Sequence, residues 1–309
     1  MPLHPEVEAF LKALHKAGAM NMETVTPDEM RGLFEKMPLN YKDAPTEFLE
    51  VHEKNIPGPL REITLWIYKP PGNGSFPVLC YFHGGGFVCG NLKTHDPVCR
   101  LLALQTPCIV VAVEYSLAPE YKFPVAPEDC YAAIEWVSQN AEILYGDKER
   151  VTVGGDSAGG NLAAVVSLMA RDRNGPSLNS QLLVHPVTIM ISSTHSYEEY
   201  GEVYFITKEM IAWFNDHYLE GQDDKNHPYA SPLLASDLGN LPPAFILTGE
   251  YDPLRDEGEI YATRLQQAGN NAVLFRVMGH VHPFFLPGFT AGKLAISTSA
   301  AALRMAFTR

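Results

Sequence analysis

The sequence predicts an α/β fold, in which a mostly parallel sheet of eight strands is flanked by helices and covered by a helical cap. Short apolar runs typical of strands alternate with helical stretches, which is the pattern of a parallel sheet with helices on both faces. The first two runs follow each other like the strands of a hairpin. One long interval without a strand pattern, after residue 186, indicates an insertion.

Residues 1–45 are expected to form an N-terminal helical cap segment, and residues 46–309 one domain that carries the sheet. The first helix is expected over residues 4–15, where apolar side chains recur at the spacing of an amphipathic helix, at Val7, Phe10, Leu11 and Leu14. A second helix is expected from Thr26, because Thr-Pro-Asp-Glu offers an N-cap, a proline in the first turn and two acidic side chains. Both helices precede every strand pattern, which favours a separate cap.

Eight runs rich in β-branched and aromatic residues predict the strands. In chain order they are FLEVHEK from Phe48, EITLWIY, VLCYF, CIVVAV (108–113), RVTVGG (150–155), QLLVHP (181–186), AFILTG (244–249) and AVLFRV (272–277). Helices are expected between most of them, at about 97–105, 127–143, 158–171 and 255–268. The insertion at about 187–241 contains one further expected helix at 207–219, and an insertion of this size usually caps a site.

Composition and charge restrict the partners of this 309-residue chain. Its net charge is −13, from 36 acidic and 23 basic residues without a basic run, so neither nucleic acid nor an anionic membrane surface is expected as a partner. The five cysteines lack the paired spacing of metal or redox sites. Neither a secretory pattern nor an apolar segment of the roughly 18 residues that span a bilayer is found, so a cytoplasmic location is expected.

The candidate nucleophile is Ser157, in the G-x-S-x-G pattern of residues 155–159. The pattern directly follows the strand RVTVG and directly precedes a helical stretch, and a sharp strand-to-helix turn of this kind holds a serine in a strained backbone. The helix N-terminus behind the serine favours the negative charge of an oxyanion. A plain turn or a phosphate-binding loop is the alternative, but neither phosphate-loop fingerprint matches.

A glycine triplet follows the predicted strand VLCYF in the sequence HGGGF, residues 83–87. Three consecutive glycines cost backbone entropy, so a packed domain keeps them where unusual dihedral angles or close approach are needed. The backbone N–H groups of Gly84 and Gly85, together with that of Ala158, are therefore predicted to bind the oxyanion. A flexible surface loop is the alternative. His83 is expected to brace the loop rather than to titrate.

The acid and base of a triad should follow the serine in the order Asp or Glu, then His. Asp252 comes directly after the strand AFILTG, where the active-site groups of open α/β sheets gather, although it could instead serve as a helix N-cap. Asp256, one turn into the next helix, is the weaker candidate. His280 and His282 both follow the strand AVLFRV, and their spacing alone leaves the choice of base open.

Together these features resemble the hormone-sensitive-lipase-like esterases of the α/β-hydrolase fold, particularly their bacterial and archaeal branch. The resemblance extends from about residue 50 to the C-terminus, and its blocks are HGGGF, a THD (His95 and Asp96), YSLAPE (115–120), GDSAGGN and DPLRDEG. By position it implies Ser157 as nucleophile, Asp252 as acid and His282 as base, with Gly84, Gly85 and Ala158 as oxyanion donors. His280 and Pro283 occupy positions at which the family has methionine and glycine.

The function that this resemblance implies is that of a serine carboxylesterase. It would cleave short- to medium-chain esters, small-molecule substrates, through an acyl-enzyme intermediate, with no metal or cofactor. Members of the family pair into dimers through an edge strand, so a homodimer is a candidate assembly. An amidase or peptidase with the same triad is one alternative. A noncatalytic small-molecule receptor is another, although such receptors lack the base.

Overall fold

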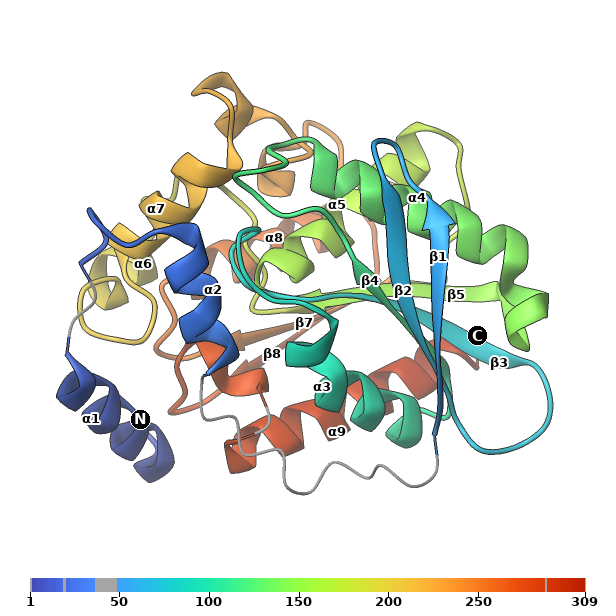
Figure 1. The fold of residues 1–309 in the computed structure, drawn as a ribbon, viewed down its shortest axis with the longest axis horizontal. Coiled ribbons are helices and arrows are strands. Elements are labelled where there is room, and N and C mark those ends of the chain that lie inside the picture. The colour runs from blue at the N-terminus through green and yellow to red at the C-terminus, as the bar shows by residue number, and fades with distance from the viewer. Residues whose placement is uncertain (1, 19–20, 37–48, 287, 309) are drawn as a thin grey trace.

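The computed structural model in Figure 1 describes residues 2–18, 21–36, 49–286 and 288–308. Within them the sheet has eight strands in the order β1-β2-β4-β3-β5-β6-β7-β8, where β1 and β2 run antiparallel to their neighbours and all other pairs are parallel. The strands are β1 (Glu50–Pro57), β2 (Glu62–Lys69), β3 (Phe76–Phe82), β4 (Ile109–Glu114), β5 (Gly146–Asp156), β6 (Ser180–Val184), β7 (Ala244–Gly249) and β8 (Ala272–Val277). The predicted fold class is confirmed.

Helices cover both faces of this sheet, as Figure 1 shows. One face packs against α3 (Leu92–Gln105) and α9 (Thr290–Ala306). The other packs against α4 (Val125–Asn140), α5 (Ala158–Asp172) and α8 (Arg255–Gln267). Alternate side chains of a strand point to opposite faces, and in β3 the side chains of Leu79 and Tyr81 join the α3 and α9 core, while those of Val78, Cys80 and Phe82 join the other core.

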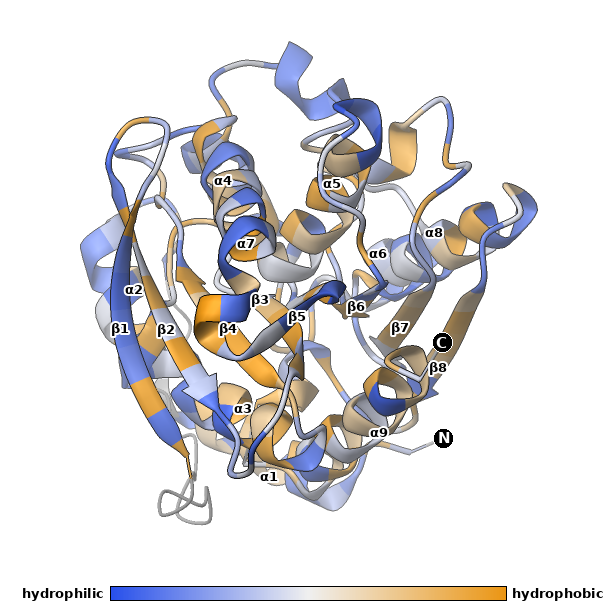
Figure 2. Ribbon diagram, turned by 90° about the vertical axis from the view of Figure 1, so that its right-hand side faces the viewer, coloured by the Kyte–Doolittle hydropathy of each residue, from blue (hydrophilic) through white to orange (hydrophobic). Residues whose placement is uncertain are grey.

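The hydropathy of each strand follows its place in the sheet. The central strand β4 is mainly hydrophobic and the edge strand β1 mixes polar and apolar residues, as Figure 2 shows. In β4 every residue but Glu114 is buried, as expected for a strand that is covered on both faces. The other edge strand, β8, leaves apolar side chains in solvent, since Val273 is 51% and Phe275 41% exposed.

Helices outside these two layers lie together on one side of the molecule. They are α1 (Pro5–Ala17), α2 (Pro27–Glu35), α6 (His195–Tyr200) and α7 (Lys208–Tyr218), with the 3₁₀ turns η2 (Asp223–Asn226) and η3 (Pro232–Leu234). The rings of Phe10 in α1 and Phe205 between α6 and α7 are 5.7 Å apart, so the N-terminal segment packs against the insertion. The predicted cap boundary at residues 45 and 46, and the start of the first predicted strand at Phe48, lie outside the described residues.

Candidate active site

Ser157 lies in the sharp turn between β5 and α5. Its backbone has φ of 54° and ψ of −117°, a conformation that residues other than glycine rarely adopt. The turn presses against the end of β3, because a Cβ on Gly159 would come within 1.9 Å of the carbonyl oxygen of Phe82, and one on Gly155 within 2.4 Å of the same atom. Close packing therefore requires the two glycines of the pattern.

Asp252 and His282 reach Ser157 from the ends of two neighbouring strands, β7 and β8. The His282 Nε2 atom lies 2.9 Å from the Ser157 hydroxyl oxygen, and the His282 Nδ1 atom lies 2.8 Å from a carboxylate oxygen of Asp252. With its Nδ1–H donated to the buried carboxylate, the imidazole presents the lone pair of Nε2 to the serine hydroxyl. The structure thus brings together the three residues that the sequence predicts as a triad.

The competing histidine, His280, is directed elsewhere. Its Nδ1 atom lies 2.9 Å from the carbonyl oxygen of Met278, and its ring centroid lies 5.0 Å from that of His4, the N-cap residue of α1. Burial lowers the pKa of His280 below its ordinary value. Across the described residues, no hydrogen bond joins His280 to Ser157 or Asp252, so the geometry favours His282 as the base.

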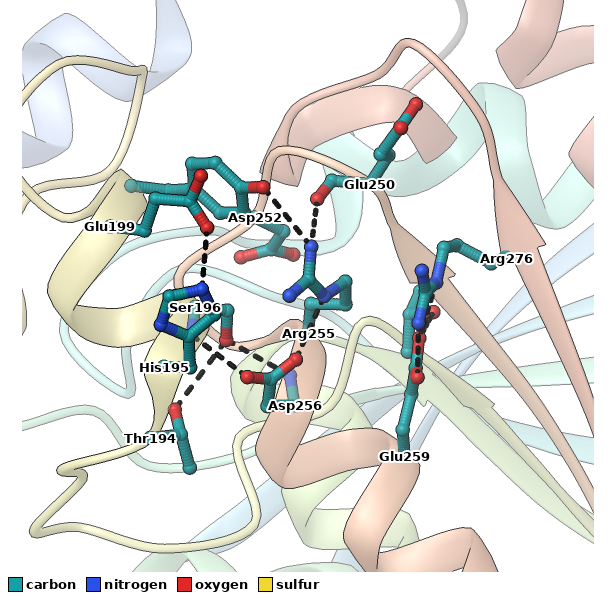
Figure 3. A network of polar contacts seen from close by, with 12 residues as sticks. Thr194, His195, Ser196, Glu199, Glu250, Asp252, Arg255, Asp256, Glu259 and Arg276 are labelled. Carbon is teal, nitrogen blue, oxygen red and sulfur yellow. Dashed lines mark hydrogen bonds and ion pairs between the residues drawn. The ribbon is translucent and has the colours of Figure 1, made fainter. Parts of the chain in front are cut away.

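Asp256, the weaker candidate for the acid, connects α8 to the insertion instead. The Ser196 N–H donates to its carboxylate at 2.8 Å, and the Asp256 N–H donates back to the Ser196 hydroxyl at 3.0 Å. Arg255 donates to the same carboxylate at 2.8 Å and to the carbonyl oxygen of Glu250 at 2.8 Å, as Figure 3 shows. This network ties α6 to the loop that carries Asp252.

The predicted donor Gly84 is already engaged by a buried carboxylate. Its N–H donates to Asp156 Oδ1 at 3.2 Å, so the prediction that it binds an oxyanion does not fit this geometry. The N–H groups of Gly85, Gly86 and Ala158 have no hydrogen bond to any described residue. The glycine triplet in the sequence could not distinguish Gly84 from Gly85 and Gly86, because a sequence pattern does not show which backbone N–H group is bound by another side chain.

Asp156 is the centre of this buried network. It also accepts a hydrogen bond of 2.6 Å from the Tyr81 hydroxyl and lies 3.3 Å from His95 Nε2. Burial acts to raise the pKa of Asp156, but His95 and Tyr81 stabilise the charged form, and the net shift is downward. Sequence reasoning missed this role, because Asp156 occupies the free position of G-x-S-x-G. The THD block that contains His95 was the available signal.

His83 braces the glycine triplet from its other side. Its Nδ1 atom lies 2.8 Å from the carbonyl oxygen of Gly84, and its own carbonyl accepts a 2.7 Å hydrogen bond from the Tyr115 hydroxyl. Burial, helped by the nearby His95, lowers the pKa of His83 to about 3, so its imidazole is neutral at neutral pH. The geometry matches the bracing role predicted for His83.

A second buried histidine, His185, was missed by sequence reasoning because it ends an apolar strand run. Its ring centroid lies 4.3 Å from that of His282 and 5.0 Å from that of Phe284. Burial, and then the neighbouring His282, lower the pKa of His185 to about 3. This neutral ring packs against the imidazole of the candidate base.

The described residues contain no group of three or more His, Cys, Asp or Glu side chains that could hold a metal ion. None of the helices in these parts of the chain has both the length and the hydrophobicity needed to cross a membrane.

Comparisons with known proteins give a consistent result. The profile of a family described as having the alpha/beta hydrolase fold matches residues 79–286. The carboxylic ester hydrolase LipN of Mycobacterium tuberculosis is 43% identical over 85% of this chain and 70% of its own length. An arylesterase of Saccharolobus solfataricus is 37% identical over 97% of this chain and 98% of its own. A hyperthermophilic esterase of Pyrobaculum calidifontis superposes with a TM-score of 0.95 at 41% identity, over 99% of this chain and 100% of that one.

Proposed function

This chain belongs to the hormone-sensitive-lipase-like branch of the α/β-hydrolase fold family and is a carboxylic ester hydrolase, and we propose that it cleaves short- to medium-chain esters through an acyl-enzyme on Ser157. The observation that carries the serine mechanism is the position of His282, which contacts Ser157 at 2.9 Å and Asp252 at 2.8 Å. A serine hydroxyl is a weak nucleophile until a base accepts its proton, and this contact supplies the base.

In the proposed mechanism the Ser157 oxygen attacks the ester carbonyl carbon while His282 Nε2 takes the hydroxyl proton. The carbonyl oxygen becomes an oxyanion, which the N–H groups of Gly85, Gly86 and Ala158 stabilise. The bond to the alkoxy oxygen then breaks, and the alcohol leaves with the proton from His282. Water attacks the acyl-enzyme in the same way and releases the acid. Asp252 orients the imidazole and stabilises its positive charge in both halves.

Burial of the site supports a small substrate. Ser157 and His282 are only 7% and 5% exposed, so little of the nucleophile and the base is open to solvent. We propose that residues 1–45 and the insertion at 187–241 together form the cap that restricts access to them. The net charge of −13 further favours neutral esters over anionic ones.

Steady-state kinetics with esters of increasing acyl length test this proposal. We expect kcat/KM to be highest for short or medium chains, and Ser157→Ala to lower kcat by about 10⁴-fold or more. A matched amide with the same acyl and leaving groups should react far more slowly than the ester. Dominant amide cleavage would favour the amidase alternative, and an active Ser157→Ala variant would exclude the serine mechanism. Absence of turnover for every ester would favour a receptor.

A further inference from the structure

Arg31 in α2 connects the N-terminal segment directly to the loop of residues 83–90, which contains the glycine triplet and is called the glycine loop below. Its Nε–H donates to the carbonyl oxygen of Val88 at 2.9 Å, and one Nη2–H donates to that of Ala118 at 2.9 Å. The other contacts of the guanidinium are bonds of 2.6 and 2.9 Å to the two carboxylate oxygens of Glu120, and one of 3.2 Å to Asp28. These bonds use all five N–H donors of the planar group.

The two carbonyl groups that Arg31 binds belong to segments that hold the proposed oxyanion donors. Val88 lies in a tight turn with Gly85, because the Val88 N–H donates to the Gly85 carbonyl oxygen at 3.2 Å. The segment of Ala118 is joined to the same loop, since the Ala118 N–H donates to the Phe87 carbonyl oxygen at 2.9 Å. Arg31 therefore closes a ring of hydrogen bonds with Phe87, Val88 and Ala118, next to the turn that contains Gly85 and Gly86.

The insertion contacts the same loop from α7. The ring of Tyr218 stacks on that of Phe87 with centroids 3.8 Å apart. A Cβ on Gly86 would come within 2.3 Å of the Phe214 ring, so this aromatic side chain lies directly against the loop. Both parts of the cap thus touch the segment that stabilises charge in the proposed mechanism.

We propose that Arg31 is a positioning residue, through which the cap fixes the N–H groups of Gly85 and Gly86 for the oxyanion. This inference rests on the proposed function, because it gives the cap a part in stabilising the transition state besides enclosing the substrate. Oxyanion donors act only when they are held in place before the reaction, and small displacements are costly. Lysine cannot replace Arg31, since an ammonium group lacks the planar fork that reaches two carbonyl groups and a carboxylate together.

The test compares an ester with its thionoester, in which sulfur replaces the carbonyl oxygen and accepts hydrogen bonds weakly. Wild type, Arg31→Met and Arg31→Lys are measured with both substrates. Arg173→Met is the matched control, because Arg173 forms a similar two-bond pair with Glu128, at 2.6 and 2.8 Å, away from the glycine loop. Thermal unfolding and the burst of released alcohol are recorded for each variant, so that the folded, reactive fraction is known.

We expect both Arg31 variants to lower kcat for the ester by about tenfold or more, with a smaller change in KM and little change for the thionoester. The ratio of ester to thionoester rates should then fall, while Arg173→Met keeps the wild-type ratio. An unchanged ratio would overturn the positioning role while Ser157→Ala remained inactive toward the ester. A Ser157→Ala variant with wild-type activity would overturn the proposed function and this inference together.

Discussion

The buried carboxylate of Asp156 controls the start of the glycine loop although it is not part of the triad. It accepts hydrogen bonds from the N–H of Gly84 and the hydroxyl of Tyr81, and the Nε2 atom of His95 lies 3.3 Å from it. Such a site suits an ionised carboxylate, which only accepts hydrogen bonds. The downward shift of the Asp156 pKa reflects this arrangement.

We expect Asp156→Asn to lower the free energy of unfolding by about 2 kcal/mol, because a neutral amide oxygen accepts the Tyr81 hydroxyl and the Gly84 N–H more weakly than a carboxylate does. The value of kcat should also fall by about tenfold as Gly84 loses its partner. Denaturant unfolding and steady-state kinetics check both effects. A variant with wild-type stability and kcat would show that Asp156 does not hold the loop, and would restore Gly84 as a candidate donor.

The buried carboxyl group of Glu257 in α8 should make the stability of the folded protein depend on pH. Its carboxylate accepts the Thr188 N–H at 2.7 Å, and burial raises its pKa from the ordinary 4.5 to about 8. A pKa that is higher in the folded state gives stability that is complete below pH 4.5 and is lost as the pH rises through 8. We expect Glu257→Gln to remove this loss. The difference in Tm, variant minus wild type, should therefore increase between pH 5 and 8.5, and a constant difference would contradict the assignment.

Sequence patterns pointed to most residues of the candidate site, but they did not show which groups each residue contacts through hydrogen bonds. Ser157 and Asp252 are identifiable because each directly follows a recognisable strand, and the fold brings the ends of such strands together. Residues alone could not choose between His280 and His282, since both follow β8 and only the direction of the side chain differs. The mismatch between the expected role of Gly84 and its geometry has a similar cause, because Asp156 binds its N–H through a contact between separate segments.

Helix α1 lies on the loop that carries the candidate base. The His4 N–H donates to the carbonyl oxygen of Gly279 at 2.9 Å, and Glu6 accepts the Thr290 N–H at 2.8 Å. Apolar side chains fill the space between, where Val7 and Leu11 of α1 pack with Val281 and Phe289. The helix therefore covers a loop that would otherwise expose apolar surface next to His282.

Deleting residues 1–18 should lower Tm and reduce kcat by about tenfold, because the loop around His282 loses these contacts. Deletion of residues 1–40 also removes Arg31 and should further weaken activity and shift the preference for acyl-chain length. Circular dichroism and kinetics on an ester series measure both. Unchanged kinetics in the longer deletion would refute a role for the N-terminal segment in the reaction.

Most elements follow from periodicity, and the exceptions have local causes. Helix α3 starts at Leu92 rather than at 97, since Asn91 caps it and Pro97 lies inside it instead of at its start. Helix α6 is too short, at six residues, for a periodic pattern to appear. Helix α9 was not predicted, because it follows the last strand, and helices were expected between the strands. Tertiary packing against α3 forms its buried face.

At the scale of the whole molecule, the mostly parallel sheet with helices on both faces follows from the alternation of strands and helices, but the strand order and the assembly do not. The edge strand β8 exposes Val273 and Phe275, which are apolar side chains on an unpaired edge. We expect the protein to form a homodimer through this edge, and Val273→Asp/Phe275→Asp to be monomeric. Light scattering coupled to size exclusion measures the mass of both, and a monomeric wild type would contradict this expectation.

The central claim, an acyl-enzyme on Ser157 formed with His282 as base, is tested most directly by the mass of the intact protein quenched during turnover of an ester. We predict a transient increase equal to the acyl group, located by peptide mapping on the peptide that contains Ser157. The increase should be absent in Ser157→Ala, strongly slowed in His282→Ala and retained in His280→Ala. An adduct on a residue other than Ser157, or one that His280→Ala abolishes and His282→Ala retains, would contradict the mechanism.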